Sequence, residues 1–282
     1  MSRIYDALKK LEAERLGRTN GKNGGNGGNG GNGHGNGRNG GNGHGKRGWR
    51  RFFGNGKTNG HAQVALSFDL GPEMEEAYHR LGTNLLLPGA AEATSTPRLI
   101  GVTASRHGEG ATTTAAVFAS ILVRRRGGRV AVVEANLRSP SFDTVFKIAR
   151  NGGFAELIQS QRPVGEIALA TEVPNLFAIG CGHPTMGAPA LFDSPGLVPA
   201  LEQLRAHFDF VIFDLPPANV YGDTSILGPR LDAAMIVIEA DRTRIPEVER
   251  TRRSLERVGV KLVGSVLNRR RSYIPAFLEE ML

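Results

Sequence analysis

The sequence predicts a doubly wound α/β domain, in which a mostly parallel sheet carries helices on both faces, preceded by a disordered N-terminal tether. The chain has 282 residues, of which 40% are hydrophobic, so it is long enough to bury one sizeable core. From about residue 96, short β-rich runs alternate with helical stretches, which is typical of a parallel sheet covered on both faces. Residues 20–45 are almost entirely Gly and Asn, and such a composition cannot bury enough apolar surface to fold.

Strands and helices alternate along the predicted domain. Strands are expected at 98–104, 129–134, 175–180, 208–214, 233–239 and 261–268, where β-branched and other apolar residues gather. Helices are expected between them, at 111–125, 153–160, 196–206 and 246–258. Together they indicate four regions: a docking helix at 1–17, a Gly/Asn-rich disordered linker at 18–61, the α/β domain at 62–270 and a C-terminal tail at 271–282.

Three segments outside the α/β domain carry apolar side chains. One face of the predicted helix 1–17 carries Ile4, Leu8 and Leu11, which suits docking onto a partner or membrane, or back onto the domain. The linker ends in Lys46, Arg47, Trp49, Arg50, Arg51, Phe52 and Phe53. This mixture suits an anionic membrane interface, or else a patch that packs on the domain. The tail carries Ile274, Phe277, Leu278 and Met281 at helical spacing, for packing on the domain or on a partner.

The positive charge of the chain lies outside the predicted domain. Residues 1–61 hold 12 Lys and Arg against 3 Asp and Glu, whereas residues 62–282 hold 23 against 24. The domain therefore lacks the net basic charge of a duplex-DNA binder, and no nucleic-acid partner is favoured. The single Cys excludes an internal disulfide, and no apolar run of about 18 residues predicts a membrane span. We expect a cytoplasmic protein, free or peripheral on the inner face of the cell membrane.

A glycine-containing segment, SRHGEGATTT at 105–114, lies between the first predicted strand and a helix. This is where a phosphate-binding loop belongs, because backbone N–H groups and the helix N-terminus attract anions there. The candidate phosphate ligands are Gly108, Gly110, Ala111, Thr112 and Thr113. Ala111 stands where such loops carry the Lys that reaches the terminal phosphates.

Two further strand ends carry polar side chains. Asp214 ends the strand at 208–214, and the segment EANLRSP at 134–140 begins at the end of another strand. Since the carboxyl ends of parallel strands share one edge of the sheet, we expect both to meet the phosphate loop there. Thr112 and Asp214 are the predicted Mg²⁺ ligands.

These segments resemble the bacterial tyrosine kinases of capsular and exopolysaccharide synthesis, which are related to partition and cell-division-site ATPases. The resemblance rests on EAYHRLGTNLLL (76–87), VTASRHGEGATTT (102–114), EANLRSP (134–140), DFVIFDLPP (209–217) and VGSVLNR (263–269), and on the opening MSRIYDAL. It implies ATP or ADP with Mg²⁺ as ligands and Asp214 and Glu134 as catalytic carboxylates. It also implies Asn268 near the adenine, and Arg138 as a further nucleotide-binding residue.

The chain departs from the family pattern at four places. Ala111 replaces the loop Lys, and Asn136 occupies a position that is acidic in the family. The E-x-x-R-x-x-R pattern implicated in ring assembly reads Glu76, His79 and Gly82. The C-terminal tyrosine cluster is reduced to Tyr273. Arg106, Arg138 or a neighbouring subunit could supply the missing cation.

These departures predict a degenerate family member, a pseudokinase whose loop either binds nucleotide weakly or is a structural relic with an empty pocket. It would act as a cytoplasmic regulatory or scaffold partner of a membrane polysaccharide co-polymerase or export assembly, contacted through the helix 1–17, and self-association is allowed. One alternative is an active tyrosine autokinase or ATPase with an atypical phosphate loop. A second alternative is a nucleotide-dependent positioning switch like the partition ATPases.

Overall fold

The strands of the sheet form from the apolar runs that the alternating pattern predicts, with one addition. The computed structural model describes residues 72–86, 98–146, 148 and 152–270. The strands are β1 (Leu99–Ala104), β2 (Val130–Glu134), β3 (Leu169–Ala170), β4 (Leu176–Ile179), β5 (Phe210–Asp214), β6 (Ala233–Glu239) and β7 (Leu262–Asn268). The short strand β3 was not predicted, because two residues show no periodicity.

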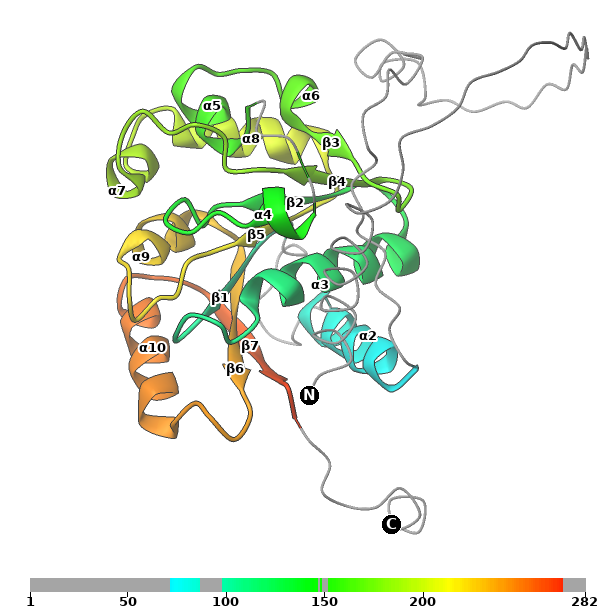
Figure 1. Ribbon diagram of the computed structural model, residues 1–282, viewed down its shortest axis with the longest axis vertical. Coiled ribbons are helices and arrows are strands. Elements are labelled where there is room, and N and C mark those ends of the chain that lie inside the picture. The colour runs from blue at the N-terminus through cyan, green and yellow to red at the C-terminus, as the bar shows by residue number, and fades with distance from the viewer. Residues whose placement is uncertain (1–71, 87–97, 147, 149–151, 271–282) are drawn as a thin grey trace, which may run out of the picture. The chain divides into compact units, whose positions relative to one another are not determined.

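The sheet has the strand order β3-β4-β2-β5-β1-β6-β7 (Figure 1). Every neighbouring pair is parallel except β3 with β4, which is antiparallel. The residues of β1 and β2 are all buried, as expected for strands that are covered on both faces. The prediction of a mostly parallel, doubly wound sheet is therefore confirmed.

The helices connect these strands and cover the sheet. They are α2 (Pro72–Leu86), α3 (Ala111–Arg126), α4 (Phe142–Val145), α5 (Phe154–Gln159), α6 (Val164–Ile167), α7 (Ala188–Phe192), α8 (Leu197–His207), α9 (Asp223–Leu227), the 3-10 helix η2 (Gly228–Arg230) and α10 (Ile245–Arg257). Figure 1 shows α2 and α3 on one side of the sheet and α9 and α10 on the other. The four predicted helices correspond to α3, α5, α8 and α10. The others were not predicted, and most of these are too short to show a 3.6-residue period.

Helix α2 carries the positions at which the family has its assembly pattern. Glu76 is exposed, His79 is half-buried and Gly82 is buried. A Cβ atom on Gly82 would lie 3.7 Å from Phe118 and 3.8 Å from Leu122, both on α3. The third position of the pattern therefore faces the neighbouring helix, where a Cβ atom would make ordinary van der Waals contact.

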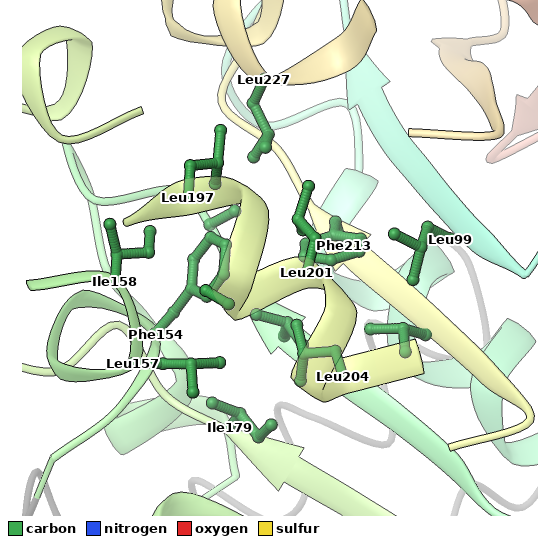
Figure 2. Packing of buried hydrophobic residues seen from close by; sticks show 14 of the residues in the cluster. Leu99, Phe154, Leu157, Ile158, Ile179, Leu197, Leu201, Leu204, Phe213 and Leu227 are labelled. Atoms are coloured by element: carbon green, nitrogen blue, oxygen red, sulfur yellow. The ribbon is translucent and has the colours of Figure 1, made fainter. Parts of the chain in front are cut away.

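A large apolar cluster lies between β1, β2, β4 and β5 and the helices α5, α7 and α8 (Figure 2). Phe154 is fully buried there, and its ring centroid lies 5.6 Å from that of Phe213 and 6.1 Å from that of Phe192. The tilted rings join β5 to both α5 and α7. This cluster fixes β2 and β5, whose carboxyl ends carry Glu134 and Asp214.

The docking helix 1–17, the linker 18–61 and the tail 271–282 lie outside the described residues, and their predictions stand as made. Within the described part of the chain, no helix combines the length and apolar character that a bilayer span requires.

Truncating Phe154 to Ala should destabilise the protein strongly, because it empties space between α5, α7 and β5. We expect Phe154→Ala to lower the free energy of unfolding by about 3–5 kcal/mol. Val198→Ala, at a side chain that is 50% exposed on α8, should change it by less than about 0.5 kcal/mol. Urea unfolding followed by circular dichroism measures both, and equal losses would contradict this packing.

Candidate functional site

Three loops meet at the carboxyl edge of the sheet because β2, β5 and β1 are adjacent and parallel. The loop after β1 holds the predicted phosphate loop, and the other two follow Glu134 and Asp214. Glu134 and Asp214 are paired in register on neighbouring strands. The first turn of α3 reaches the end of β5, since the Thr112 hydroxyl donates to Asp214 Oδ2 at 2.8 Å. Side chains from distant parts of the sequence thus share one site.

The phosphate loop has the backbone shape that its glycines allow. Gly110 precedes α3 with a φ of 97°, in the left-handed region that non-glycine residues rarely adopt. A Cβ atom there would lie 2.2 Å from Asn268 Nδ2. That same amide nitrogen donates to the carbonyl oxygen of Glu109 at 2.8 Å. The structure thus places Asn268, at the end of β7, directly against the loop.

Glu109 holds the loop from inside, a role that the sequence analysis did not predict. Its side chain is only 2% exposed. Its Oε2 atom accepts from the backbone N–H of Ser105 at 2.7 Å and of Arg106 at 3.1 Å, and Oε1 accepts from the Thr243 hydroxyl. The carboxylate therefore uses the first two amides of the loop, and the later amides, at the N-terminus of α3, remain for an anion. An acidic residue between two glycines, at Gly108-Glu109-Gly110, is the sequence signal that could have revealed it.

Helix α10 fastens the start of the loop. The hydroxyl groups of Ser105 and Thr251 are hydrogen-bonded at 2.8 Å, and both residues are fully buried. Arg106 forms an ion pair with Glu247, one turn earlier on α10. The guanidinium of Arg106, a candidate replacement for the missing Lys, therefore points to a carboxylate of α10.

Asp214 is the most perturbed carboxylate of the site. It is 1% exposed, and its Oδ1 atom is buried without a hydrogen-bond partner. Burial raises the pKa of Asp214 to about 8, and the nearby charge of Glu134 acts in the same direction. An orphaned buried acceptor is rare in folded proteins and points to a missing donor or cation.

The residues present fit a Mg²⁺ ion. Thr112 offers a hydroxyl, and Asp214 offers the orphaned oxygen Oδ1. No group of three or more His, Cys, Asp or Glu suited to a metal occurs in the part of the chain that the structure describes. Mg²⁺ typically binds through one or two carboxylates, with phosphate oxygens and water as its other ligands, so this sparse set suits it.

Glu134, the second predicted catalytic carboxylate, is committed to the backbone. It is 2% exposed. Its Oε1 atom accepts from the N–H groups of Ser141 and Phe142, the latter at 2.7 Å, and Oε2 accepts from Cys181 N–H at 3.0 Å. Burial raises the pKa of Glu134, while these amides act in the opposite direction. The carboxylate thus joins two loops, and both of its oxygens are engaged.

The neighbouring polar side chains of this loop have local or buried partners. Asn136 Oδ1 accepts from Ser139 N–H at 3.3 Å. Arg138 donates to both carboxylate oxygens of Asp223, from Nε at 2.9 Å and from Nη2 at 3.2 Å.

Arg138 also lies over the ring of Tyr221, 5.2 Å from its centroid. The other neighbour of that ring is His107 of the phosphate loop, at 5.5 Å between centroids. Arg138, which was predicted to bind nucleotide, is therefore held by Asp223 and Tyr221.

Among the described residues, the buried side chains of charged residue types are all carboxylates. The four are Glu109, Glu134, Asp214 and Asp223, all at the carboxyl edge of the sheet. No Lys, Arg or His of the described segments is buried. Within the described residues, a polyanionic ligand would therefore meet no buried cation at this edge.

The fold and this site define an α/β domain of the phosphate-loop NTPase type. No protein-family model matches the chain. A curated relative, the tyrosine-protein kinase CpsD of Streptococcus pneumoniae, is 28% identical over 209 residues, which cover 74% of this chain and 88% of the relative. The tyrosine-protein kinase YwqD of Bacillus subtilis is 25% identical over 193 residues, 68% of this chain and 80% of the relative.

Solved structures share the fold. The kinase domain of the Escherichia coli tyrosine kinase ETK matches 72% of this chain and 79% of its own, with a TM-score of 0.63 and 20% identity. A cobyrinic acid a,c-diamide synthase of Mycobacterium smegmatis, solved with bound ADP and magnesium, matches 60% of this chain and 73% of its own, with a TM-score of 0.52 and 18% identity. The chain is thus similar to bacterial tyrosine kinases over most of their length.

The raised pKa of Asp214 predicts how stability depends on pH. Without a bound cation, the folded protein keeps a proton on Asp214 up to pH about 8, whereas the unfolded chain releases it near pH 4. The contribution of this group to stability is therefore full below pH about 4 and is lost as the pH rises through about 8. Asn resembles the protonated form and cannot lose a proton.

We therefore expect Asp214→Asn to gain stability relative to the wild type between pH 5 and pH 9, by more than about 1 kcal/mol. Urea unfolding of both proteins in EDTA measures the difference at each pH. A difference that stays constant between pH 5 and pH 9 would show that Asp214 is already ionised in the folded protein.

Proposed function

We propose that this chain is a family member with impaired phosphoryl transfer, which acts as a cytoplasmic regulatory or scaffold partner of a membrane polysaccharide co-polymerase or export assembly. One observation carries the proposal. Ala111 leaves the phosphate loop without its Lys, and both candidate substitutes are engaged elsewhere, Arg106 with Glu247 and Arg138 with Asp223.

The loss of catalysis follows from what phosphoryl transfer requires. Charge develops on the transferring group, and fixed cations around it provide most of the stabilisation. A positioned general base adds about 10²- to 10⁴-fold. In this chain Asn136 cannot accept a proton as a carboxylate does, and both oxygens of Glu134 are engaged by backbone amides. The phosphate loop therefore lacks its cation, and neither Asn136 nor Glu134 is available as the base.

Nucleotide binding requires fewer protein groups than phosphoryl transfer does. The amides at the start of α3 can hold a phosphate without a Lys, and Gly110 keeps the loop open to them. Thr112 and Asp214 would hold Mg²⁺, which supplies positive charge beside the phosphates. We therefore expect weak ATP and ADP binding that depends on Mg²⁺ and serves as a conformational signal.

The regulatory role rests on the segments outside the domain. The predicted helix 1–17 is joined to the domain by the linker 18–61, so a partner can hold the helix while the domain moves over a distance of roughly 35–40 Å. The basic and aromatic residues at 46–53 would place the end of the linker on an anionic membrane surface. Both features suit a tethered partner of a membrane assembly.

The proposal predicts separate outcomes for binding and for catalysis. Restoring the cation with Ala111→Lys should tighten Mg²⁺-dependent ADP binding about tenfold or more, because a phosphate gains a charge-assisted contact. Isothermal titration of wild type and variant, each with and without Mg²⁺, measures this. Ala111→Gln is the matched control, since it adds similar bulk without the charge.

Catalysis is tested by incubating the wild type with Mg²⁺ and ATP and measuring phosphotyrosine and released phosphate. We expect both to stay at the level of the Asp214→Ala variant. Turnover at a rate typical of kinases, about 1 s⁻¹ or more, that Asp214→Ala abolishes would support an active autokinase or ATPase and overturn the proposal.

The linker end should bind anionic vesicles through charge and aromatic contacts together. Replacing Trp49, Phe52 and Phe53 by Ser, or Arg50 and Arg51 by Gln, should each weaken co-sedimentation of the full chain with phosphatidylserine vesicles by about tenfold or more. Raising the salt concentration should weaken the wild type but leave binding to neutral vesicles unchanged. Equal sedimentation of all variants would show that this segment has no membrane role.

A further inference from the structure

Exposed apolar side chains gather at the last strand of the sheet. Seven large apolar side chains of the described residues are at least 42% exposed. Four of them belong to the unit formed by α10, its C-terminal turn and β7, namely Ile245, Val258, Val263 and Leu267. Val263 and Leu267 are 45% and 56% exposed, and the register of β7 is irregular at Val263, between Leu262 and Gly264. Leu267 is paired with Ile238 of β6, which packs in the same cluster as Leu255 of α10, so Leu267 lies on the face of the sheet that α10 covers. The domain thus leaves apolar side chains exposed along this strand.

The two edges of the sheet differ. At one edge, β3 has only two residues, and a short edge strand offers little template for pairing. At the other edge, β7 has seven residues, LVGSVLN, without a charge or a Pro among them. Within the described strands its partner is β6 alone, and Figure 1 shows β7 at this border of the sheet. Such an edge is normally covered in a folded protein.

The chain itself supplies a segment that fits this strand. Arg269, directly after β7, has a φ of 58°, a left-handed conformation that turns the chain away from the strand direction. Residues 271–282 follow, with Ile274, Phe277, Leu278 and Met281 spaced so that they share one face of a helix. A helix over 273–282 would be about 15 Å long, and β7 spans about 20 Å.

We propose that residues 271–282 fold back as an amphipathic helix beside α10 and cover the exposed side of β7. Ile274, Phe277, Leu278 and Met281 then pack on Val263 and Leu267, antiparallel to the strand. Helix α10 has the same orientation, because it connects the parallel strands β6 and β7 and therefore also runs antiparallel to them. The charged Glu279 and Glu280 remain at the border with solvent, toward the start of β7, where Lys261 is exposed.

A helix of residues 271–282 on β7 would affect the phosphate loop as well as the edge of the sheet. Asn268 is the last residue of β7, and its side chain donates to the Glu109 carbonyl oxygen. Arg269 forms an ion pair with Glu239 of β6 at 2.8 Å. A helix seated on β7 restricts the end of that strand and so holds Asn268 against the loop. The inference does not depend on whether the chain catalyses phosphoryl transfer.

The test compares two neighbouring positions of the tail in the full chain. Phe277→Asp places a charge on the apolar face, whereas Ala276→Asp places the same charge on the opposite face of the helix. Hydrogen exchange measured by mass spectrometry reports the amides of residues 262–268. We expect Phe277→Asp to speed their exchange about tenfold, and Ala276→Asp to leave it unchanged. Equal exchange in the wild type and both variants would overturn the proposal.

A second measurement identifies what lies on the strand. The paired change Leu267→Cys with Leu278→Cys should give a disulfide within one chain under mild oxidation, because the two side chains are expected in contact. Hydrogen exchange of the wild type at several protein concentrations should show that the protection of β7 does not change with concentration. A disulfide that forms only between chains, or protection that rises with concentration, would assign the strand to a second copy and overturn the proposal.

Discussion

Four carboxylates buried at one edge of the sheet determine what this site can do. Three are satisfied by the protein: Glu109 and Glu134 by backbone amides, with a hydroxyl for Glu109, and Asp223 by Arg138. Asp214 alone keeps an acceptor without a partner. No buried cation lies beside these carboxylates in the described residues. If the chain binds nucleotide as we propose, the missing loop Lys should make that binding depend on Mg²⁺.

The shape of the phosphate loop survives this loss because the rest of the protein holds it. Glu109 braces it from inside, α10 holds its start through Ser105 and Thr251, and β7 supports its end through Asn268. None of these contacts involves position 111. A loop supported in this way can keep a nucleotide-binding form after catalysis has declined, which is how one fold serves both enzymes and switches. It also means that movement of α10 or β7 would be felt at the phosphate site.

Much of the fold was predictable from the sequence, because the strands are long apolar runs followed by periodic helices. The short helices α4, α6 and α7 were not, since four or five residues carry no period. The positions of Asp214 and Thr112 followed from the motif order, whereas the partners of the arginines did not. Glu247 lies 141 residues from Arg106, and Asp223 lies 85 residues from Arg138. Only the packing of α10 and of the loop after β5 brings these charges together, so both arginines could be taken for free cations until the tertiary structure was known.

The most direct test of the account is a crystal structure of the full chain with Mg²⁺ and a non-hydrolysable ATP analogue at saturating concentration. The account predicts Mg²⁺ on Thr112 and Asp214, backbone amides of α3 on the phosphates, and both arginine ion pairs unchanged. A guanidinium of Arg106 or Arg138 on the terminal phosphate, with its carboxylate partner released, would contradict it, because the chain would then supply the cation that its loop lacks.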